Sequence, residues 1–217
     1  MISRAIRHLP GIGPQRDRLL KDQGLDRWDA IVSHPVDVLR MGRDAWQRVQ
    51  VEAKRCETAR QAEDLGYLTR TLHPVDHWRL LAEWFPDLTF FDIETTGCEW
   101  ESETTVIVVY KDGQIHRFVR HENLEGVLDI MHEAAVLVSF NGGSFDVPRV
   151  LETFHIPQLP APHIDLRWVC YHHGLAGGLK CIERGLGLAR PVELSGVEGL
   201  EAVRLWQQWD GFGDRGA

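Results

Sequence analysis

From residue 88 onward, apolar and polar positions follow the patterns that β-strands require. Residues 88–95 read Leu-Thr-Phe-Phe-Asp-Ile-Glu-Thr, residues 104–110 are β-branched and apolar, and residues 115–119 follow a Lys-Asp-Gly-Gln turn. β-Branched and aromatic residues favour strands, and a short turn that contains Asp-Gly favours a hairpin. The pattern predicts three antiparallel strands at the start of a sheet.

The chain then changes to helical spacing and returns to a strand. Residues 124–134 have the spacing of a helix, and residues 135–140 form a continuous apolar run. Such a run is typical of a buried strand, which makes the sheet mixed. Before the strands, residues 44–66 are expected to be helical, and residues 67–84 form a connector with a break at His73-Pro74. We expect a helical region over residues 1–72 and an α/β domain over residues 75–217, with its sheet flanked by helices.

Two carboxylates stand one residue apart in the first strand. Because side chains alternate along a strand, Asp92 and Glu94 share one face, while Phe91 and Ile93 point into the core. An unpartnered pair of this kind repels, and all-oxygen ligation suits Mg²⁺ or Mn²⁺. A divalent-metal site is one interpretation, and a solvated strand face is the other.

The ends of the first and fourth strands supply further candidates. Thr95-Thr96-Gly97 ends the first strand in a turn whose N–H groups are free to face a ligand. The fourth strand ends in Asn141-Gly142-Gly143-Ser144-Phe145-Asp146. If these strands are neighbours, Asp146 approaches Asp92 and Glu94 as a third carboxylate; the alternative is that it only caps the next helix.

Composition narrows the class of protein. The chain has 217 residues, 43% hydrophobic content and a net charge of −8. This charge is unevenly distributed: residues 1–72 carry a net +3 and residues 73–217 a net −11. No segment approaches the roughly 20 apolar residues of a membrane span, and the N-terminus has no apolar signal core. The four cysteines form no C-x-x-C pair, which argues against zinc and fits free thiols. We expect a cytoplasmic protein.

The basic region opens with a glycine-rich turn, His8-Leu9-Pro10-Gly11-Ile12-Gly13-Pro14. This segment resembles a helix-hairpin-helix unit, in which a glycine turn joins two short helices and presents N–H groups to a phosphate. Gly11 and Gly13 are therefore candidate nucleic-acid-binding residues. The alternative is an ordinary helical packing element.

The motifs together resemble a known family. They are Asp92-Ile93-Glu94-Thr95-Thr96-Gly97, Phe140 to Asp146, His163-Ile164-Asp165-Leu166-Arg167, Gly177 to Glu183 and Leu186-Gly187-Leu188. In this order, they are similar to the YprB-type ribonuclease-H-like domain of the DEDD (DnaQ-like) 3′–5′ exonucleases. The resemblance covers residues 75–217 and implies a ribonuclease-H-like α/β fold.

The resemblance also implies roles. Asp92 would bridge two Mg²⁺ or Mn²⁺ ions, Glu94 would bind the ion on the nucleophile side, and Asp146 would hold the other, for two-metal hydrolysis of phosphodiester bonds. Thr95, Thr96 and Gly97 would lie against the terminal nucleotide.

Three further residues have two interpretations each. Asn141 and Phe145 would contact sugar or base, although Phe145 also fits the core. Lys180 would meet a phosphate or remain a solvated helix lysine. Asp165 would make a polar contact or cap the helix expected over residues 166–173.

One departure concerns the end of the family's pattern. Members follow the Leu-Trp segment, here at Leu205-Trp206, with a helix that carries Tyr-Asn-x-x-Asp, whose Asp completes the metal site. Asp210 and Asp214 stand too early for that spacing. Three explanations stay open: the chain is a fragment, a natural truncation or one subunit of a shared site.

Two function classes follow. The first is a metal-dependent 3′–5′ exonuclease acting on the 3′ end of single-stranded nucleic acid. The second is a catalytically impaired nucleic-acid-binding or assembly module. The sequence does not separate DNA from RNA substrates, because no residue is identifiable as a reader of the 2′-hydroxyl.

Overall fold

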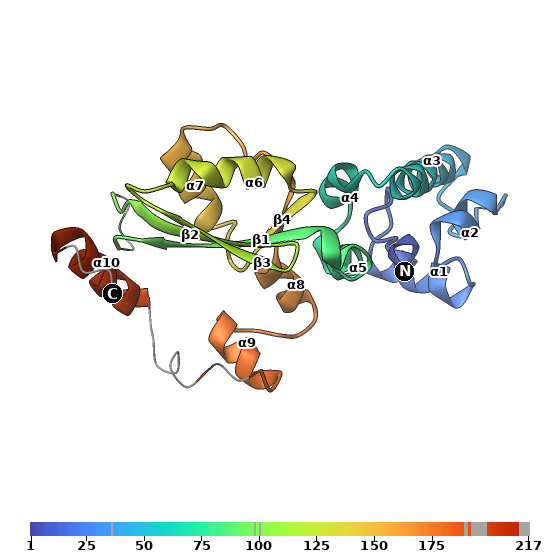
Figure 1. The fold of residues 1–217 in the computed structure, drawn as a ribbon. Helices are drawn as coiled ribbons and strands as arrows, with labels where there is room; N and C mark the ends of the chain where they lie inside the picture. The colour runs from blue at the N-terminus through green and yellow to red at the C-terminus, as the bar shows by residue number, and fades with distance from the viewer. Residues whose placement is uncertain (36, 98, 100, 189–190, 192–198, 213–217) are drawn as a thin grey trace. The chain divides into compact units, whose positions relative to one another are not determined.

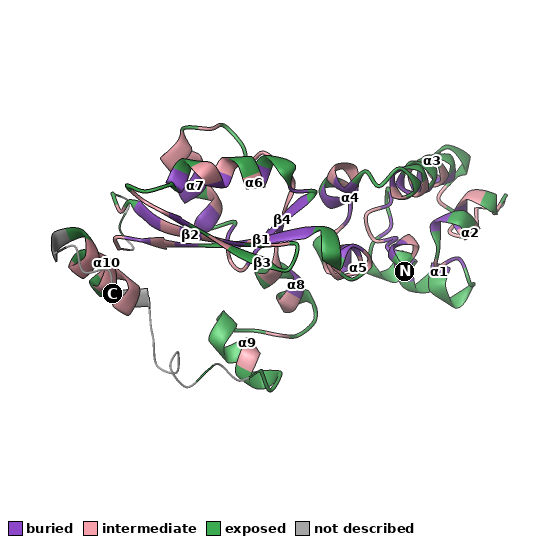
Figure 2. Ribbon diagram, in the orientation of Figure 1, coloured by how far each residue is buried: buried purple, intermediate pink, exposed green. Residues whose placement is uncertain are grey.

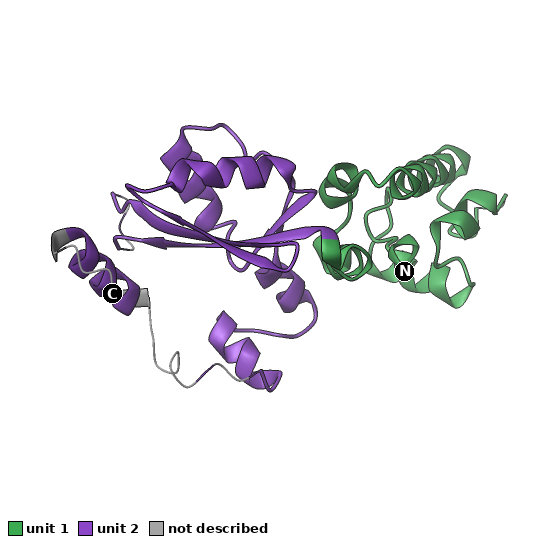
Figure 3. Ribbon diagram, in the orientation of Figure 1, with its two compact units in different colours: residues 1–86 green, residues 87–217 purple. Residues whose placement is uncertain are grey.

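In the computed structural model of the chain, residues 1–217 are described except 36, 98, 100, 189–190, 192–198 and 213–217. Two compact units, Met1–Pro86 and Asp87–Ala217, divide the chain (Figure 3). Compactness does not show independent folding, so the domain division at residues 72–75 stays a prediction. Among the described residues, no helix is both long and apolar enough to cross a bilayer.

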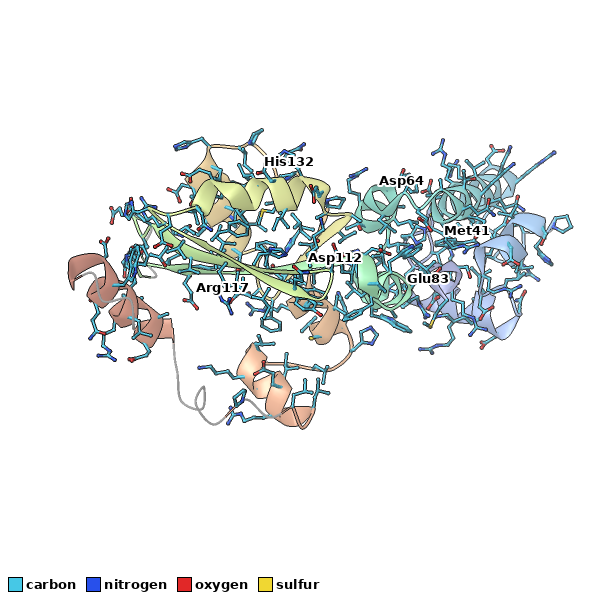
Figure 4. All side chains as sticks on the ribbon, viewed as in Figure 1. Met41, Asp64, Glu83, Asp112, Arg117 and His132 are labelled. Atoms are coloured by element: carbon cyan, nitrogen blue, oxygen red, sulfur yellow. The ribbon has the colours of Figure 1, made fainter. Side chains whose placement is uncertain are left out.

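The unit Met1–Pro86 is helical. Its elements are the 3₁₀ turns η1 (Ile2–Arg4) and η2 (Pro74–Asp76), α1 (Pro14–Asp22), α2 (Trp28–Ser33), α3 (Arg43–Gln61), α4 (Leu65–Thr71) and α5 (His77–Glu83). Trp28 is fully buried, and its indole N–H donates to the Ala5 carbonyl at 2.6 Å. Glu83, labelled in Figure 4, accepts hydrogen bonds from the Met1 and Ile2 nitrogens. These contacts bring both ends of the unit together.

The segment expected as a connector between residues 67 and 84 holds α4 and α5. Helix α3 ends at Gln61 because Glu63 adopts a left-handed φ of 54°, and Asp64 then caps α4 by accepting from the Tyr67 N–H. The expected break at His73-Pro74 is confirmed, since Pro74 is the first residue of η2.

The unit Asp87–Ala217 contains the sheet. The strands are β1 (Leu88–Thr95), β2 (Thr104–Lys111), β3 (Gln114–Val119), β4 (Val136–Ser139) and β5 (His163–Asp165), in the order β3-β2-β1-β4-β5. β1 and β2 pair antiparallel, as do β2 and β3, whereas β1 runs parallel to β4 and β4 parallel to β5. The predicted mixed sheet, with the first and fourth strands as neighbours, is confirmed.

The predicted hairpin joins β2 to β3. Asp112, labelled in Figure 4, and Gly113 have positive φ angles of 52° and 76°. Two consecutive positive φ angles match the turn type that follows the twist of the flanking strands.

Helices cover the sheet and close its core. The helices of this unit are α6 (Val127–Glu133), α7 (Asp146–Phe154), α8 (Leu166–His172), α9 (Leu179–Gly185) and α10 (Gly199–Phe212), with the 3₁₀ turns η3 (Phe85–Asp87), at the border of the two units, and η4 (Leu124–Gly126). α6 and α7 both cover one face of the sheet (Figure 1), and residues of both belong to one core cluster. There Phe91, Ile93 and Ile107 pack against Val127 and Met131. The ribonuclease-H-like α/β fold is thus in place, and Figure 2 shows its buried strands.

Candidate functional site

Side chains alternate between the two faces of β1, which places Asp92 and Glu94 on the face away from the core, as predicted. Phe91 and Ile93 belong to the buried core, whereas Asp92 is exposed and Glu94 half-buried. The register pairs β1 with β4 only from Leu88 to Phe90. Asp92 and Glu94 therefore extend past the paired part of β4, at the edge where both parallel strands end.

Asp146 arrives at the same edge from the next element. It is the first residue of α7, only 3% exposed, and Phe145 rather than Asp146 is the N-cap residue. Hydrogen bonding with the backbone of Ile93 places the Asp146 carboxyl against β1, between the positions of Asp92 and Glu94. The described residues give its buried Oδ1 no hydrogen-bond partner. Asp146 is therefore not the N-cap residue of α7, and its role as a third carboxylate stays a prediction.

The electrostatics of the three carboxyl groups are coupled. Burial, followed by the charge of Asp92, raises the pKa of Asp146 to about 7. Burial and the same Asp92 charge also raise the pKa of Glu94. Asp92 is thus close enough to disfavour the charged forms of both partners, the condition that a bound cation would reverse.

The carboxylates do not close around a common point. Within the described part of the chain, no group of three or more His, Cys, Asp or Glu side chains is placed to hold a metal ion. Mutual repulsion between carboxylates is a physical reason for such a spread. The roles assigned to Asp92, Glu94 and Asp146 stay predictions.

A carboxylate holds the turn between β4 and α7. Asp165 accepts from the N–H groups of Asn141 at 2.7 Å and Gly143 at 3.1 Å. It also caps α8 by accepting from the Arg167 N–H at 2.9 Å, which confirms the predicted cap. Asn141 has a left-handed φ of 64°, and its Oδ1 accepts from the Arg167 guanidinium. The contacts of Asp165 with Asn141 and Gly143, and of Arg167 with Asn141, were not predicted, since they span more than 20 residues.

Gly142 is required because the backbone at this position lies very close to the Ser139 side chain. A Cβ there would come within 1.8 Å of Ser139 Oγ, which is hydrogen-bonded to His163 Nε2 at 2.8 Å. Gly142 therefore lets the turn lie directly on the ends of β4 and β5.

Hydroxyl groups of Thr95 and Thr96 form hydrogen bonds within the turn that follows β1. Thr95 Oγ1 donates to the Gly97 carbonyl at 2.5 Å, and Thr96 Oγ1 accepts from the Glu103 N–H at 3.0 Å. Arg149 of α7, only 7% exposed, donates to the carbonyls of Ser102 and Glu99. The hydroxyls of Thr95 and Thr96 thus stabilise the turn, and their contact with a nucleotide stays a prediction.

Two hollows flank the carboxylates. One of about 600 Å³ is lined by Asp92 and residues of the β4–α7 turn, α8 and the α8–α9 connection, among them Asn141, Arg167 and Tyr171. The other, of about 310 Å³, is lined by Glu94, by Val106 and Val119, and by α10 residues that include Trp206 and Trp209. Both volumes lie within the range typical of small-ligand sites.

The remaining predicted residues lie in different surroundings. Phe145 packs against the core, in agreement with its alternative interpretation, and Lys180 is exposed on α9. Asp210 lies on α10, 4.0 Å from His121, and Asp214 lies outside the described residues. Cys56, Cys170 and Cys181 are free thiols, and Cys98 lies outside the described residues.

The glycine turn of the first unit differs from the expected hairpin. The single 3₁₀ turn η1 stands where the first helix was expected, and Gly13 is the N-cap of α1. Gly11 has a φ of 75°, and a Cβ there would meet Met41 at 2.9 Å. Phosphate binding by Gly11 and Gly13 stays a prediction.

Arg167 and Tyr171 are site residues that sequence reasoning missed. Both line the larger hollow beside Asp92. A signal was present, because Trp168 and Tyr171 stand three residues apart in a helix that follows the Asp165-Leu166-Arg167 motif, and that spacing puts both rings on one face.

Comparisons with known proteins place this site in context. A family model, RNase_H_2 of the RNase_H superfamily, matches residues 89–217, which include Asp92, Glu94 and Asp146. A solved structure, the family B DNA polymerase from the hyperthermophilic archaeon Pyrobaculum calidifontis, is similar at 16% identity and a TM-score of 0.46. The match covers 59% of this chain and 21% of the polymerase chain, so the chain spans about a fifth of that protein's length. No curated protein matches.

Proposed function

Since the chain belongs to the RNase_H superfamily, we propose that it is a divalent-metal-dependent nuclease that hydrolyses phosphodiester bonds. In its finer form, the proposal is a DEDD-type 3′–5′ exonuclease of the YprB kind, acting on the 3′ end of a single strand. The observation that carries it is that Asp92, Glu94 and Asp146 all lie at the edge of the sheet where β1 extends past its pairing with β4.

The residues fit a hard divalent cation. Asp146 has a buried carboxylate oxygen for which the described residues supply no hydrogen-bond donor, and the negative charge of Asp92 lies close enough to raise its pKa. Oxygen donors of this kind suit Mg²⁺ or Mn²⁺. Asp92, Glu94 and Asp146 would hold the ions, which supply activation of water and stabilisation of the leaving oxygen when bound.

Two side chains, Asp146 and Arg167, are suited to binding metal and substrate. Asp146 exchanges a proton near pH 7 in the absence of metal, so its carboxyl becomes a good ligand when that proton leaves. Asp92 faces the larger hollow, and Arg167 is oriented beside it by the Asn141 side chain. A guanidinium in that place is suited to a phosphate of the substrate strand.

The first unit carries a separate candidate for phosphate binding. Gly13 begins α1 without a side-chain cap, so the first N–H groups of α1 remain candidates for a phosphate oxygen. Arg16, on the first turn of α1, donates to the Gly11 carbonyl and fixes the preceding turn. These features support Gly11 and Gly13 as phosphate-binding residues.

The competing candidate is a binding or assembly module without turnover. It is favoured by one observation, the absence among the described residues of a group of three side chains spaced to hold a metal. Such a module would bind strands without cleaving them.

The test is degradation of 3′-labelled and 5′-labelled single strands, DNA and RNA, with Mn²⁺ or Mg²⁺. We expect stepwise shortening from the 3′ end that is lost in Asp92→Asn, because that carboxylate is shared by the site. Asp129→Asn is the matched control, since it removes one exposed carboxylate from α6.

Three outcomes separate the candidates. Shortening from the 3′ end that needs Asp92 supports the exonuclease. Internal cleavage that needs Asp92 keeps the nuclease and rejects the direction. Strand binding with no cleavage under either ion favours the binding module.

A further inference from the structure

Helix α8 exposes two large aromatic side chains. Trp168 is 53% exposed and Tyr171 is 61% exposed, and their ring centroids lie 5.9 Å apart at an interplanar angle of 83°. Large aromatic rings are usually well buried, so an exposed pair on one helix face is informative about binding. We call Trp168 and Tyr171 the α8 shelf.

The α8 shelf is continuous with the candidate site. Tyr171 lines the hollow of about 600 Å³ that also contains Asp92, and Arg167 of the same helix lines it too. Arg167 donates to Asn141 Oδ1, which holds the guanidinium at this rim. A ligand that reached Asp92 through the hollow would therefore pass one ring of the shelf and a fixed cation.

The charge around the α8 shelf differs from that of the surrounding sequence. From the α8 N-cap onward, residues 165–188 contain three cations, Arg167, Lys180 and Arg184, and two acids, Asp165 and Glu183, a net +1, whereas residues 73–217 carry a net −11. A polyanion is attracted by such a local excess even when the whole chain is acidic. Exposed rings beside cations are the combination that binds single-stranded nucleic acids.

We infer that the α8 shelf stacks the bases of a single strand whose end enters the hollow at Asp92. This inference rests on the proposed nuclease function and adds the residues that bind the strand. A duplex would not fit, because its bases expose no free ring faces to Trp168 or Tyr171. The rings thus select unpaired strands, and they accept any base because every base has a π-face.

The first experiment measures strand binding by the full chain in EDTA, by fluorescence anisotropy with a 5′-labelled oligothymidylate. Trp168→Leu and Tyr171→Leu are each expected to weaken binding roughly tenfold, the loss of one stacked base. Trp168→Phe and Tyr171→Phe keep a ring and should remain within about threefold of the original chain. Tyr110→Leu is the matched control, since Tyr110 is exposed on β2 and contacts Phe90.

The expected result is that only the two leucine variants of the shelf lose affinity and that a blunt duplex of equal length binds far more weakly. The inference is overturned if the leucine variants bind as tightly as the original chain, or if the phenylalanine variants lose as much as the leucine variants. Binding of an acidic peptide in place of the strand would also overturn it.

Binding in EDTA separates this inference from the proposed function. Shelf-dependent binding without metal-dependent cleavage supports the shelf and rejects the nuclease. Cleavage that needs Asp92, with affinity unchanged in both leucine variants, supports the nuclease and overturns the shelf.

Discussion

Asp146 combines burial with a nearby negative charge, and both act against its ionised form. A carboxyl group in an unfolded chain has a pKa near 4, whereas that of Asp146 in the fold is about 7. The folded chain therefore holds a proton over this interval that the unfolded chain has lost. By linkage, the fold loses stability as pH rises from about 4 to 7.

We predict that Asp146→Asn flattens this pH dependence in EDTA. The amide is neutral at every pH, so the variant avoids a cost of at most about 4 kcal/mol that the original chain carries above pH 7. Melting temperatures at pH 5 and pH 8 check this: between these pH values the melting temperature of the original chain should fall further than that of the variant, by on the order of 5–10 °C. The pH dependence that Glu94 adds is the same in both chains. Equal falls in melting temperature would contradict the prediction.

At the scale of elements, α7 does more than deliver Asp146. Arg149, one turn further along, donates to the carbonyls of Ser102 and Glu99 and to Glu152 Oε2 at 3.3 Å. These bonds attach the segment after β1 to the helix that carries the third carboxylate. Arg149 therefore couples two parts of the candidate site through one buried side chain.

We predict that Arg149→Leu destabilises the chain by about 1–3 kcal/mol, because two partly buried carbonyls lose charged donors. Urea unfolding measures the loss, and faster amide exchange at Ser102 and Glu103 would locate it. Arg149→Lys is the control: it keeps the charge but not the planar fork, so an intermediate effect is expected. An unchanged unfolding midpoint in the leucine variant would show that water replaces these bonds at no cost.

The strands show what the sequence could predict. Residues 88–95 and 104–111 are long enough to display alternation, and an Asp-Gly turn fixed the register of the hairpin. β5 escaped prediction because three residues have no measurable period. α4 and α5 escaped as well, since helices of seven residues depend on tertiary packing more than on their own propensity.

The candidate site could likewise be predicted only in part. The shared location of Asp92, Glu94 and Asp146 was predictable because parallel neighbouring strands end at one edge, whereas their roles stay predictions. The Asp165 contacts with Asn141 and Gly143 were missed, because they are hydrogen bonds between segments 22 and 24 residues apart. No periodicity along the chain records such a contact.

On the scale of the whole molecule, the net charge limits how a nucleic-acid strand can bind. A net charge of −8 gives little general attraction for a polyanion, so binding must come from local cations and from stacking. Two sources of cations are available: residues 166–188 of the second unit, and the basic region of residues 1–72 with its net +3. The salt dependence of binding distinguishes them, because it counts the phosphates that are neutralised.

We predict a slope of about −2 for log K against log salt concentration, for a single strand in EDTA between about 50 and 300 mM salt. Each neutralised phosphate contributes about −0.7, and Arg167, Lys180 and Arg184 are three cations. Lys180→Ala should reduce the slope by about 0.7. Lys111→Ala should not, since Lys111 belongs to β2 and not to the segment of residues 166–188. A slope steeper than about −4 would instead mean that cations of the first unit also bind the strand, as its glycine turn at Gly11 and Gly13 suggests.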